Sequence, residues 1–379
     1  MRKQILLGTT ALMVGAIVAP GFAAAEEMPL RLEVGGYYYD YFGIGDVDDN
    51  PVAPAAARDL GNTNLFNDGE IFFQGETTLD NGLTFGVHVE LETNQPSDQI
   101  DQAYSYVSGD FGMVEIGSNN LANYNTFWSV VAPNVGVPIN SGWTTVFTPI
   151  PSGFGSAGTF LSPLLTTNLD IGNDEAQISY YSPRFAGFQF TGGYAPAVAE
   201  TGDGQITVAN EGTQYHNAFG VGLNFSNEFN GVSLGFDAGY NRGSVDTTRE
   251  AAGVDDFEQV KVGASIGFAG FTIAGSYANQ LVGKTDAANT LSNKGEAYDV
   301  GAKYATGPWA ASVAYYHGEQ QDTIAIPGDD EMDSFVGAVS YAVGPGITTS
   351  LSIYYGKHED ESGANGESTL GILGLALNF

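Results

Sequence analysis

The sequence contains no cysteine and few basic residues: lysine and arginine together number 12, against 44 aspartates and glutamates. The absence of cysteine excludes disulfides, thiol catalysis and cysteine-ligated zinc. The formal charge of −32 would repel phosphate groups, so nucleic acid is not expected as a partner.

The N-terminus has the pattern of a cleaved secretory signal peptide over residues 1–25. Arg2 and Lys3 form its positive end, an apolar core follows, and Ala23–Ala25 is a small-residue cleavage site. A transmembrane anchor is the alternative, but the run is short and no charged stop follows it. One mature domain is expected over residues 26–379.

Long apolar runs are also missing from the rest of the chain, because Gly, Asn, Asp or Ser interrupts each one within about a dozen residues. Hydrophobic residues still make up 43% of the chain, which argues against disorder. The 52 glycines, 23 phenylalanines and 20 tyrosines favour strands and tight turns over a helix-rich enzyme. The mature chain is therefore either an exported soluble β-protein or a membrane β-barrel.

Polar and apolar residues alternate over strand-length segments. The segment 83–92 reads LTFGVHVELE, which places apolar residues on one face and polar residues or glycine on the other. The segments 231–241, 257–268 and 367–379 repeat this pattern. About sixteen strands are expected, over residues 30–42, 66–79, 83–93, 100–108, 111–117, 174–182, 187–195, 213–226, 231–241, 256–268, 270–280, 295–305, 308–318, 331–343, 346–357 and 367–379.

Short and long connections alternate along the chain. Asp80-Asn81-Gly82 is a tight hairpin signal, whereas the connection at 118–173 is very long. A barrel that crosses a membrane has this pattern, since short turns face the periplasm and long loops face outside. The sequence predicts an all-β fold: a closed antiparallel transmembrane β-barrel around an aqueous lumen.

Aromatic residues cluster near the expected strand ends. We interpret them as girdles at the two membrane interfaces, with packing in a β-core as the alternative. The clusters are Tyr37, Tyr38, Tyr39, Tyr41 and Phe42, and Tyr354 with Tyr355.

Three segments resemble Gram-negative general porins of the alphaproteobacterial type. SYVSGDFGMVEIGS at 105–118 is similar to the hairpin before the constriction loop, and AQISYYSPRFAGFQFTGGY at 176–194 is similar to the hairpin after it. TLGILGLALNF, which ends in Phe379, is similar to the closing strand. The resemblance implies an outer-membrane homotrimer of barrels of about sixteen strands. It also implies that the third external loop, here 118–173, folds into the lumen.

The expected constriction loop departs from the family in its charge. Ser118 stands where the family usually has an arginine of a basic cluster, and between 118 and 173 only Asp170 is ionised. The loop is rich in apolar residues that include Trp128 and Trp143. They either make the constriction apolar or, as we favour, pack the loop onto the inner wall.

Strand phase predicts which charged residues line the pore. The predicted acids are Glu33, Glu70, Glu76, Glu90, Glu92, Asp101, Glu115, Glu175, Asp237 and Asp299, and the predicted bases are Arg31, Lys261 and Lys303. An acidic tube enriches cations and repels anions. We therefore expect a channel for small hydrophilic solutes and ions, selective for cations at low salt.

Other functions remain as alternatives: a substrate-specific channel, a surface β-protein that never enters a membrane, or a barrel hydrolase. An enzyme is not expected, because His88, His216, His317 and His358 sit singly on different segments and outside any catalytic motif. No cofactor is expected. Acid clusters in the external loops could hold a structural divalent cation, although a solvated acidic rim is the preferred interpretation.

Overall fold

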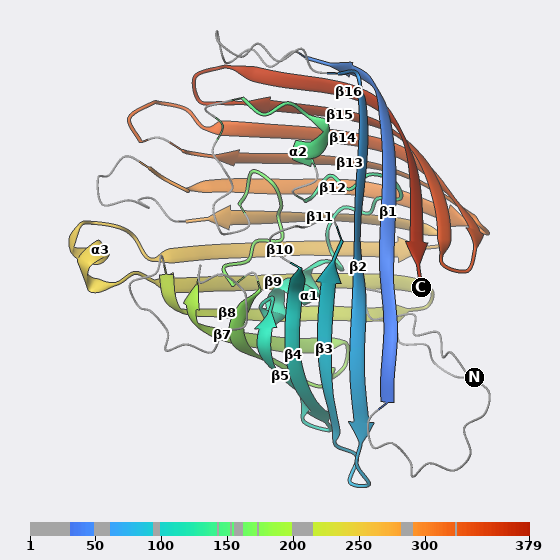
Figure 1. Cartoon of the computed structure of the whole chain (residues 1–379), viewed down its shortest axis with the longest axis vertical. Helices are drawn as coiled ribbons and strands as arrows, with labels where there is room; N and C mark the ends of the chain where they lie inside the picture. The colour runs from blue at the N-terminus through green and yellow to red at the C-terminus, as the bar shows by residue number, and fades with distance from the viewer. Residues whose placement is uncertain are drawn as a thin grey trace.

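The computed structural model describes residues 31–48, 61–93, 99–141, 144–151, 154, 162–172, 174–198, 215–281, 291–322 and 324–379; the predicted signal peptide lies outside them. Sixteen strands form one closed antiparallel barrel, in which β1 pairs with both β2 and β16 (Figure 1). The predicted fold class is confirmed. The strands are β1 (Arg31–Val47), β2 (Thr63–Thr78), β3 (Thr84–Glu92), β4 (Ile100–Gly109), β5 (Gly112–Asn119), β6 (Glu175–Tyr181), β7 (Phe188–Val198), β8 (Tyr215–Phe229), β9 (Val232–Ser244), β10 (Phe257–Phe268), β11 (Phe271–Gln280), β12 (Gly295–Thr306), β13 (Trp309–Gln320), β14 (Asp330–Gly344), β15 (Ile347–Glu359) and β16 (Asn365–Asn378).

Large apolar side chains cover the outside of the barrel, as a lipid environment requires. Val313 is 52% exposed, Ile353 is 65% exposed and Leu373 is 58% exposed, while their sequence neighbours point inward. Period-two alternation therefore separates a lipid face from a lumen face. Within the described part of the chain, no helix has the length and hydropathy of a membrane span.

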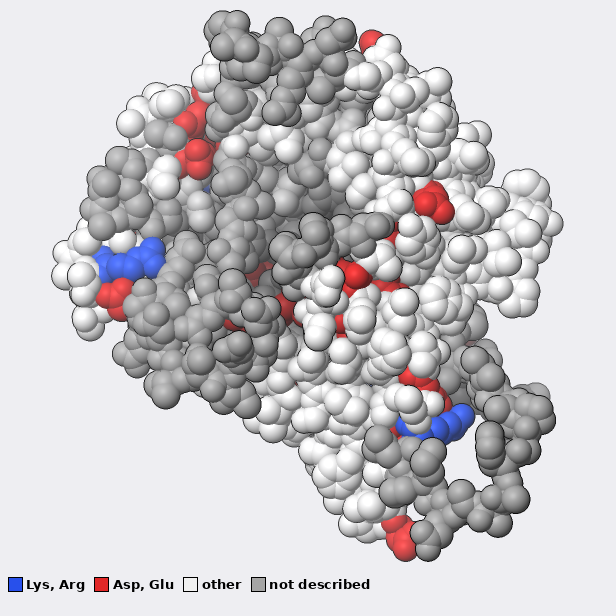
Figure 2. Space-filling model, viewed as in Figure 1, with Lys and Arg blue, Asp and Glu red and all other residues white. Residues whose placement is uncertain are grey.

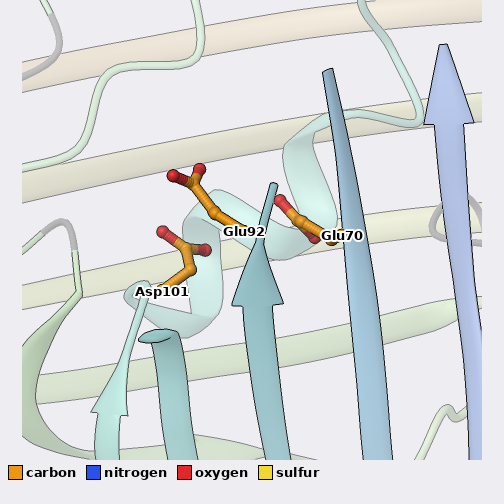
Figure 3. A group of neighbouring side chains, drawn as sticks. All are labelled: Glu70, Glu92 and Asp101. Carbon is orange, nitrogen blue, oxygen red and sulfur yellow. The ribbon is translucent and has the colours of Figure 1, made fainter. Parts of the chain in front are cut away.

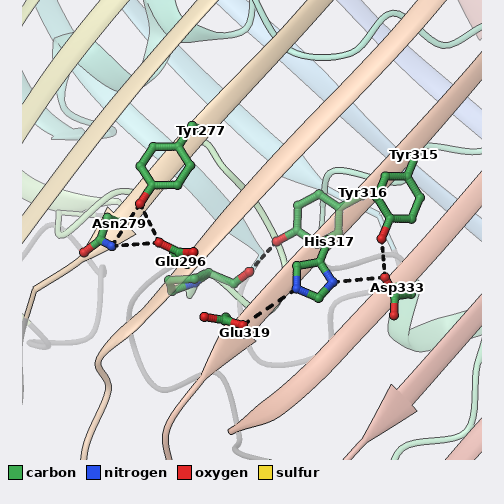
Figure 4. A network of polar contacts seen from close by, with 9 residues as sticks. Tyr277, Asn279, Glu296, Tyr315, Tyr316, His317, Glu319 and Asp333 are labelled. Carbon is green, nitrogen blue, oxygen red and sulfur yellow. Dashed lines mark hydrogen bonds and ion pairs between the residues drawn. The ribbon is translucent and has the colours of Figure 1, made fainter.

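Consecutive residues of β13 show the two faces directly (Figure 4). Tyr316 points inward and donates a hydrogen bond to the carbonyl of Pro163. Its neighbours Tyr315 and His317 point outward to Asp333 of β14, at 2.5 Å from Tyr315 Oη and 3.0 Å from His317 Nδ1. Alternate side chains of β13 therefore face the interior of the barrel and its outer surface.

Aromatic side chains form two outward-facing bands on the second half of the barrel. Near the short turns, ring centroids are 4.4 Å apart for Phe271 and Tyr304 and 4.7 Å apart for Trp309 and Tyr341. The band toward the long loops includes Tyr277, Tyr298 and Tyr315. Such bands suit the interfaces between lipid and water.

The girdle interpretation was wrong for Tyr37, Tyr39, Tyr41 and Tyr354. The first three share the inward phase of β1, and the rings of Tyr41 and Tyr354 both contact Phe147 inside the barrel. Aromatic content alone does not give the face of a strand, because a tyrosine suits both a wet lumen and a lipid interface.

Short hairpins close one rim of the barrel. Asn230 and Gly231 both have positive φ, 51° and 81°, which is the conformation of a type I′ turn. The backbone N–H of Asn378 donates to the carbonyl of Gly346 at 2.7 Å, in the turn between β14 and β15. The C-terminus therefore lies at the short-turn rim.

The longest connection, between Asn119 and Glu175, runs inside the barrel. It carries two short helices, α1 (Ala122–Phe127) and α2 (Thr144–Phe147), which Figure 1 shows within the ring of strands. A third helix, α3 (Thr247–Ala251), lies in the connection from β9 to β10. Hydrogen bonds attach the long connection to the wall, including Asn123 to Asn241, Val135 to Ser312 and Thr148 to Tyr354.

Candidate functional site: the inside of the barrel

The interior has two walls of different character. The loop-covered wall consists of the inward faces of β8 to β15, which bond to the connection described above. The acidic wall consists of the inward-facing residues of β1 to β4, which are mostly half-exposed. Solute in the lumen meets the acidic wall on one side and the free surface of the loop on the other.

Six carboxylates of the acidic wall were predicted from strand phase and face the interior: Glu33, Glu70, Glu76, Glu90, Glu92 and Asp101. Glu76 is exposed and accepts a hydrogen bond from Tyr106 Oη at 2.7 Å. Glu33 lies 3.0 Å from Arg31, and Glu90 lies 2.7 Å from His88. Glu92 is half-buried at the end of β3.

Three carboxylates from neighbouring strands form a cluster on this wall (Figure 3). One oxygen each of Glu70 in β2, Glu92 in β3 and Asp101 in β4 lies within 4.8 Å of the others. A bulge opposite Val89 and Leu91 shifts the phase of β4, which places Asp101 on the inner face. Among the described residues, this is the group of carboxylates close enough to share a cation. It lies on the barrel wall, whereas the acid clusters considered from the sequence lie in the external loops.

The structure corrects the predicted pore-lining role of Asp237, Lys261 and Asp299. All three face inward, but their exposed fractions are 0%, 3% and 4%, because the loop lies on top of them. Strand phase gives the direction of a side chain but not what covers it. Glu115 is corrected in the same way, since it is buried and accepts a hydrogen bond from Asn119 at 2.7 Å.

The covered charges hold the loop in place. Asp299 accepts hydrogen bonds from the backbone N–H groups of Ala132 at 3.0 Å and Ser276 at 2.6 Å. Lys261 Nζ donates to Asn168 Oδ1 at 2.8 Å and to the carbonyl of Leu169 at 2.9 Å. These contacts fix the loop against the wall opposite the acidic wall.

Asp170 is also corrected, because it is buried within the loop and does not face the opening. Its carboxylate accepts hydrogen bonds from the backbone of Leu121 at 3.2 Å and Gly172 at 3.1 Å. Burial raises the pKa of the Asp170 carboxyl, and the charge of Lys261 opposes that shift.

The other predicted constriction residues have different positions. Ser118 Oγ donates to the carbonyl of Asp174, so it joins the two ends of the loop at the wall. Trp128 is half-buried, with its ring edge-on to Tyr124 at 5.6 Å between centroids. Trp143 lies outside the described residues.

Basic side chains are scarce along the lumen. On β1 to β5, all of which are described, Arg31 is the one basic residue, and it pairs with Glu33. Lys303 is half-exposed on the inner face near the short turns. Figure 2 shows acidic atoms in the centre of the view and basic atoms in two patches near its edges.

Sequence reasoning missed several residues of the acidic wall. Asp68 is half-buried and lies in phase with Glu70 and Glu76, so period-two counting could have found it. The inward-facing rings of Tyr37 and Phe72 were also missed, because Tyr37 was assigned to the membrane interface and Phe72 was given no role.

Comparisons with known proteins agree with this architecture. The model of the family described as Gram-negative porin matches residues 8–361. No sequence among the curated proteins matches the chain.

Solved structures with the same fold are distant in sequence. The trimer form of OmpT, an outer membrane protein of Vibrio cholerae, is 12% identical, with a TM-score of 0.59, over 92% of this chain and 99% of that one. Salmonella typhi OmpF in complex with daunomycin is 16% identical, with a TM-score of 0.57, over 93% and 98%. A mutant of the Rh. blastica porin is 17% identical, with a TM-score of 0.52, over 92% and 100%.

Proposed function

The chain belongs to the Gram-negative porin family and is a β-barrel of the outer membrane, and we propose that it passes small hydrophilic solutes and favours cations. The acidic wall carries this proposal. Its carboxylates face the lumen with Arg31 as their one basic neighbour on the described β1 to β5, while Lys261 is buried beneath the loop.

Electrostatics explains why this distribution favours cations. A lumen with charges of one sign and walls of low dielectric concentrates counterions and repels ions of the same sign. The buried Lys261 is surrounded by loop atoms, which separate its charge from solute in the lumen. Selectivity is expected to weaken with salt, because the screening length falls to about 3 Å at 1 M.

The charges at the constriction support a proposal of simple diffusion, because they do not form the opposed acidic and basic clusters that create a transverse electric field. General porins set loop acids against a basic cluster across the opening, whereas here the loop acid Asp170 and the wall base Lys261 are both buried together. Among the described residues of the long connection and of β1 to β5, the charges that face the lumen are therefore those of the acidic wall.

The assembly and the absence of catalysis also belong to the proposal. Trimers among the structures of the same fold support a homotrimer embedded in outer-membrane lipid. The four histidines lie on four separate strands, β3, β8, β13 and β15, a distribution that supports a channel over a hydrolase.

Reversal potentials in planar bilayers test this proposal. With KCl at about 0.1 M on one side and about 1 M on the other, we expect a potential of the sign that indicates potassium permeation. Equal concentrations in a second recording control for electrode offset. A potential of the opposite sign would show that chloride permeates better and would overturn cation selectivity.

A further inference from the structure

A diagonal row of rings crosses the acidic wall. Tyr39 and Tyr37 of β1 are stacked with centroids 4.8 Å apart, and Tyr37 lies 5.9 Å from Phe72 of β2. Phe72 lies 5.8 Å from His88 of β3, which lies 5.1 Å from Tyr104 of β4. We call these five residues the ring row; four strands contribute to it, and each ring contacts the next.

Four of the five rings of the row are available to solute, while His88 is buried between Phe72 and Tyr104. Tyr37, Tyr39, Phe72 and Tyr104 are half-buried, in contrast to the fully buried Tyr316 and Tyr354 beneath the loop. Each packs against its neighbour in the row and still exposes part of its surface to the lumen. The row is therefore a surface of the channel and not part of a closed core.

Carboxylates accompany the rings in register. Tyr39 pairs across the strands with Asp68, Tyr37 pairs with Glu70, and Phe72 pairs with Glu90. Directly paired residues on one face of a sheet have Cβ atoms about 5 Å apart. Each of these three rings therefore has an acidic group beside it that points into the same space.

We propose that the ring row is a binding path for organic cations that carry an aromatic or other apolar group. A cation over a ring face is attracted by the ring quadrupole, and the adjacent carboxylate adds Coulomb attraction. The apolar part of the same solute gains from contact with the neighbouring ring. A small inorganic cation uses the carboxylates alone, and a neutral sugar uses the rings without the charge attraction.

This inference depends on the proposed function, because the solute must first enter a channel that admits cations. Benzyltrimethylammonium and tetramethylammonium are suitable probes, since they share a charged group and differ by the ring. The wild-type channel is expected to bind the benzyl compound more tightly, as measured by reduction of potassium current in single-channel recordings. Glucose serves as the neutral probe.

Two double variants distinguish the contribution of the rings to cation binding from the contribution of the carboxylates. Tyr37→Leu with Phe72→Leu removes two rings and keeps every carboxylate, and should weaken block by benzyltrimethylammonium by roughly tenfold. Tyr37→Phe with Phe72→Tyr keeps both rings and should retain the block. Tyr298→Leu changes an outward-facing ring of β12 and is the matched control that should have no effect.

The outcomes distinguish this inference from the proposed function. Potassium selectivity without any preference for the benzyl compound in the wild type would overturn the ring row and leave the channel proposal intact, even if no variant folds. Block of the wild-type channel by glucose as strong as block by benzyltrimethylammonium would assign the row to neutral solutes and overturn the cation assignment. Chloride selectivity in the wild type would overturn the cation selectivity on which this inference rests.

Discussion

Lys261 of β10 and Asn168 of the long connection are joined by a hydrogen bond of 2.8 Å between Nζ and Oδ1. The ammonium group also lies 5.6 Å from the ring centroid of Tyr124 and 5.0 Å from that of Phe127. A charge that faces the lumen by strand phase thus belongs to the attachment of the loop.

Replacement of Lys261 by methionine should loosen the loop. The substitution removes the ammonium group that donates to Asn168 Oδ1 and to the carbonyl of Leu169, and a buried acceptor left without its donor costs roughly 1–3 kcal/mol. We expect a lower free energy of unfolding in urea and noisier single-channel currents. Lys303→Met, on the same face but near the short turns, is the control. Quiet currents and wild-type stability in Lys261→Met would contradict an anchoring role.

Asp299→Ala should detach a second point of the loop. The backbone N–H groups of Ala132 and Ser276 would lose their acceptor, at a cost of roughly 1–3 kcal/mol for each buried donor. Urea unfolding and channel conductance measure the effect. Glu296→Ala, on the outer face of the same strand, should change stability far less, and equal losses in both variants would count against the loop contact as the cause.

Neutralisation of the carboxylate cluster should reduce selectivity. In a variant with Glu70→Gln, Glu92→Gln and Asp101→Asn, we expect the permeability ratio of potassium to chloride to fall roughly threefold, because three charges leave the lumen wall. Reversal potentials at low salt give the ratio. Glu296→Gln removes an outward-facing charge and should preserve it; the same fall in both variants would mean that position in the lumen does not matter.

The outward position of Trp309 predicts contact with lipid. Trp309 is 57% exposed and lies beside Tyr341 in the band near the short turns. The chain has 3 tryptophans, so Trp128→Phe with Trp143→Phe leaves Trp309 as the sole emitter. Brominated lipids should quench its fluorescence strongly, whereas a water-soluble quencher should act weakly. Quenching by the soluble agent alone would place this face in water.

Much of the barrel follows from the order of residues. The alternation at 83–92 predicted β3 (Thr84–Glu92) to within a residue at its start and its end. The inward phase of Glu33, Glu76, Glu90 and Glu92 also followed from alternation, since successive side chains of a strand point to opposite faces. The bounds of a strand and the face to which each side chain points can be predicted from residues that are adjacent in sequence.

The loop could not be placed by the same reasoning. Asp237 and Glu90 have the same pattern in sequence, yet Asp237 is fully buried and Glu90 faces the lumen. The difference arises from Asn224 on the neighbouring strand β8 and from loop residues around it such as Ser129, which are far from Asp237 in the chain. Period-two counting contains no information about such contacts.

The sequence by itself determined a closed sheet with lipid outside and water inside, the number of strands, and the excess of acid within. Tertiary structure alone decided which acids meet the water, because the described part of the long connection covers Asp237 and Asp299 and leaves Glu76, Glu90 and Glu92 at least partly exposed. It also decided that the rings of Tyr37 and Phe72 come together with Glu70 and Glu90. The register between β1, β2 and β3 places these groups side by side, and the residue order within a single strand does not specify that register.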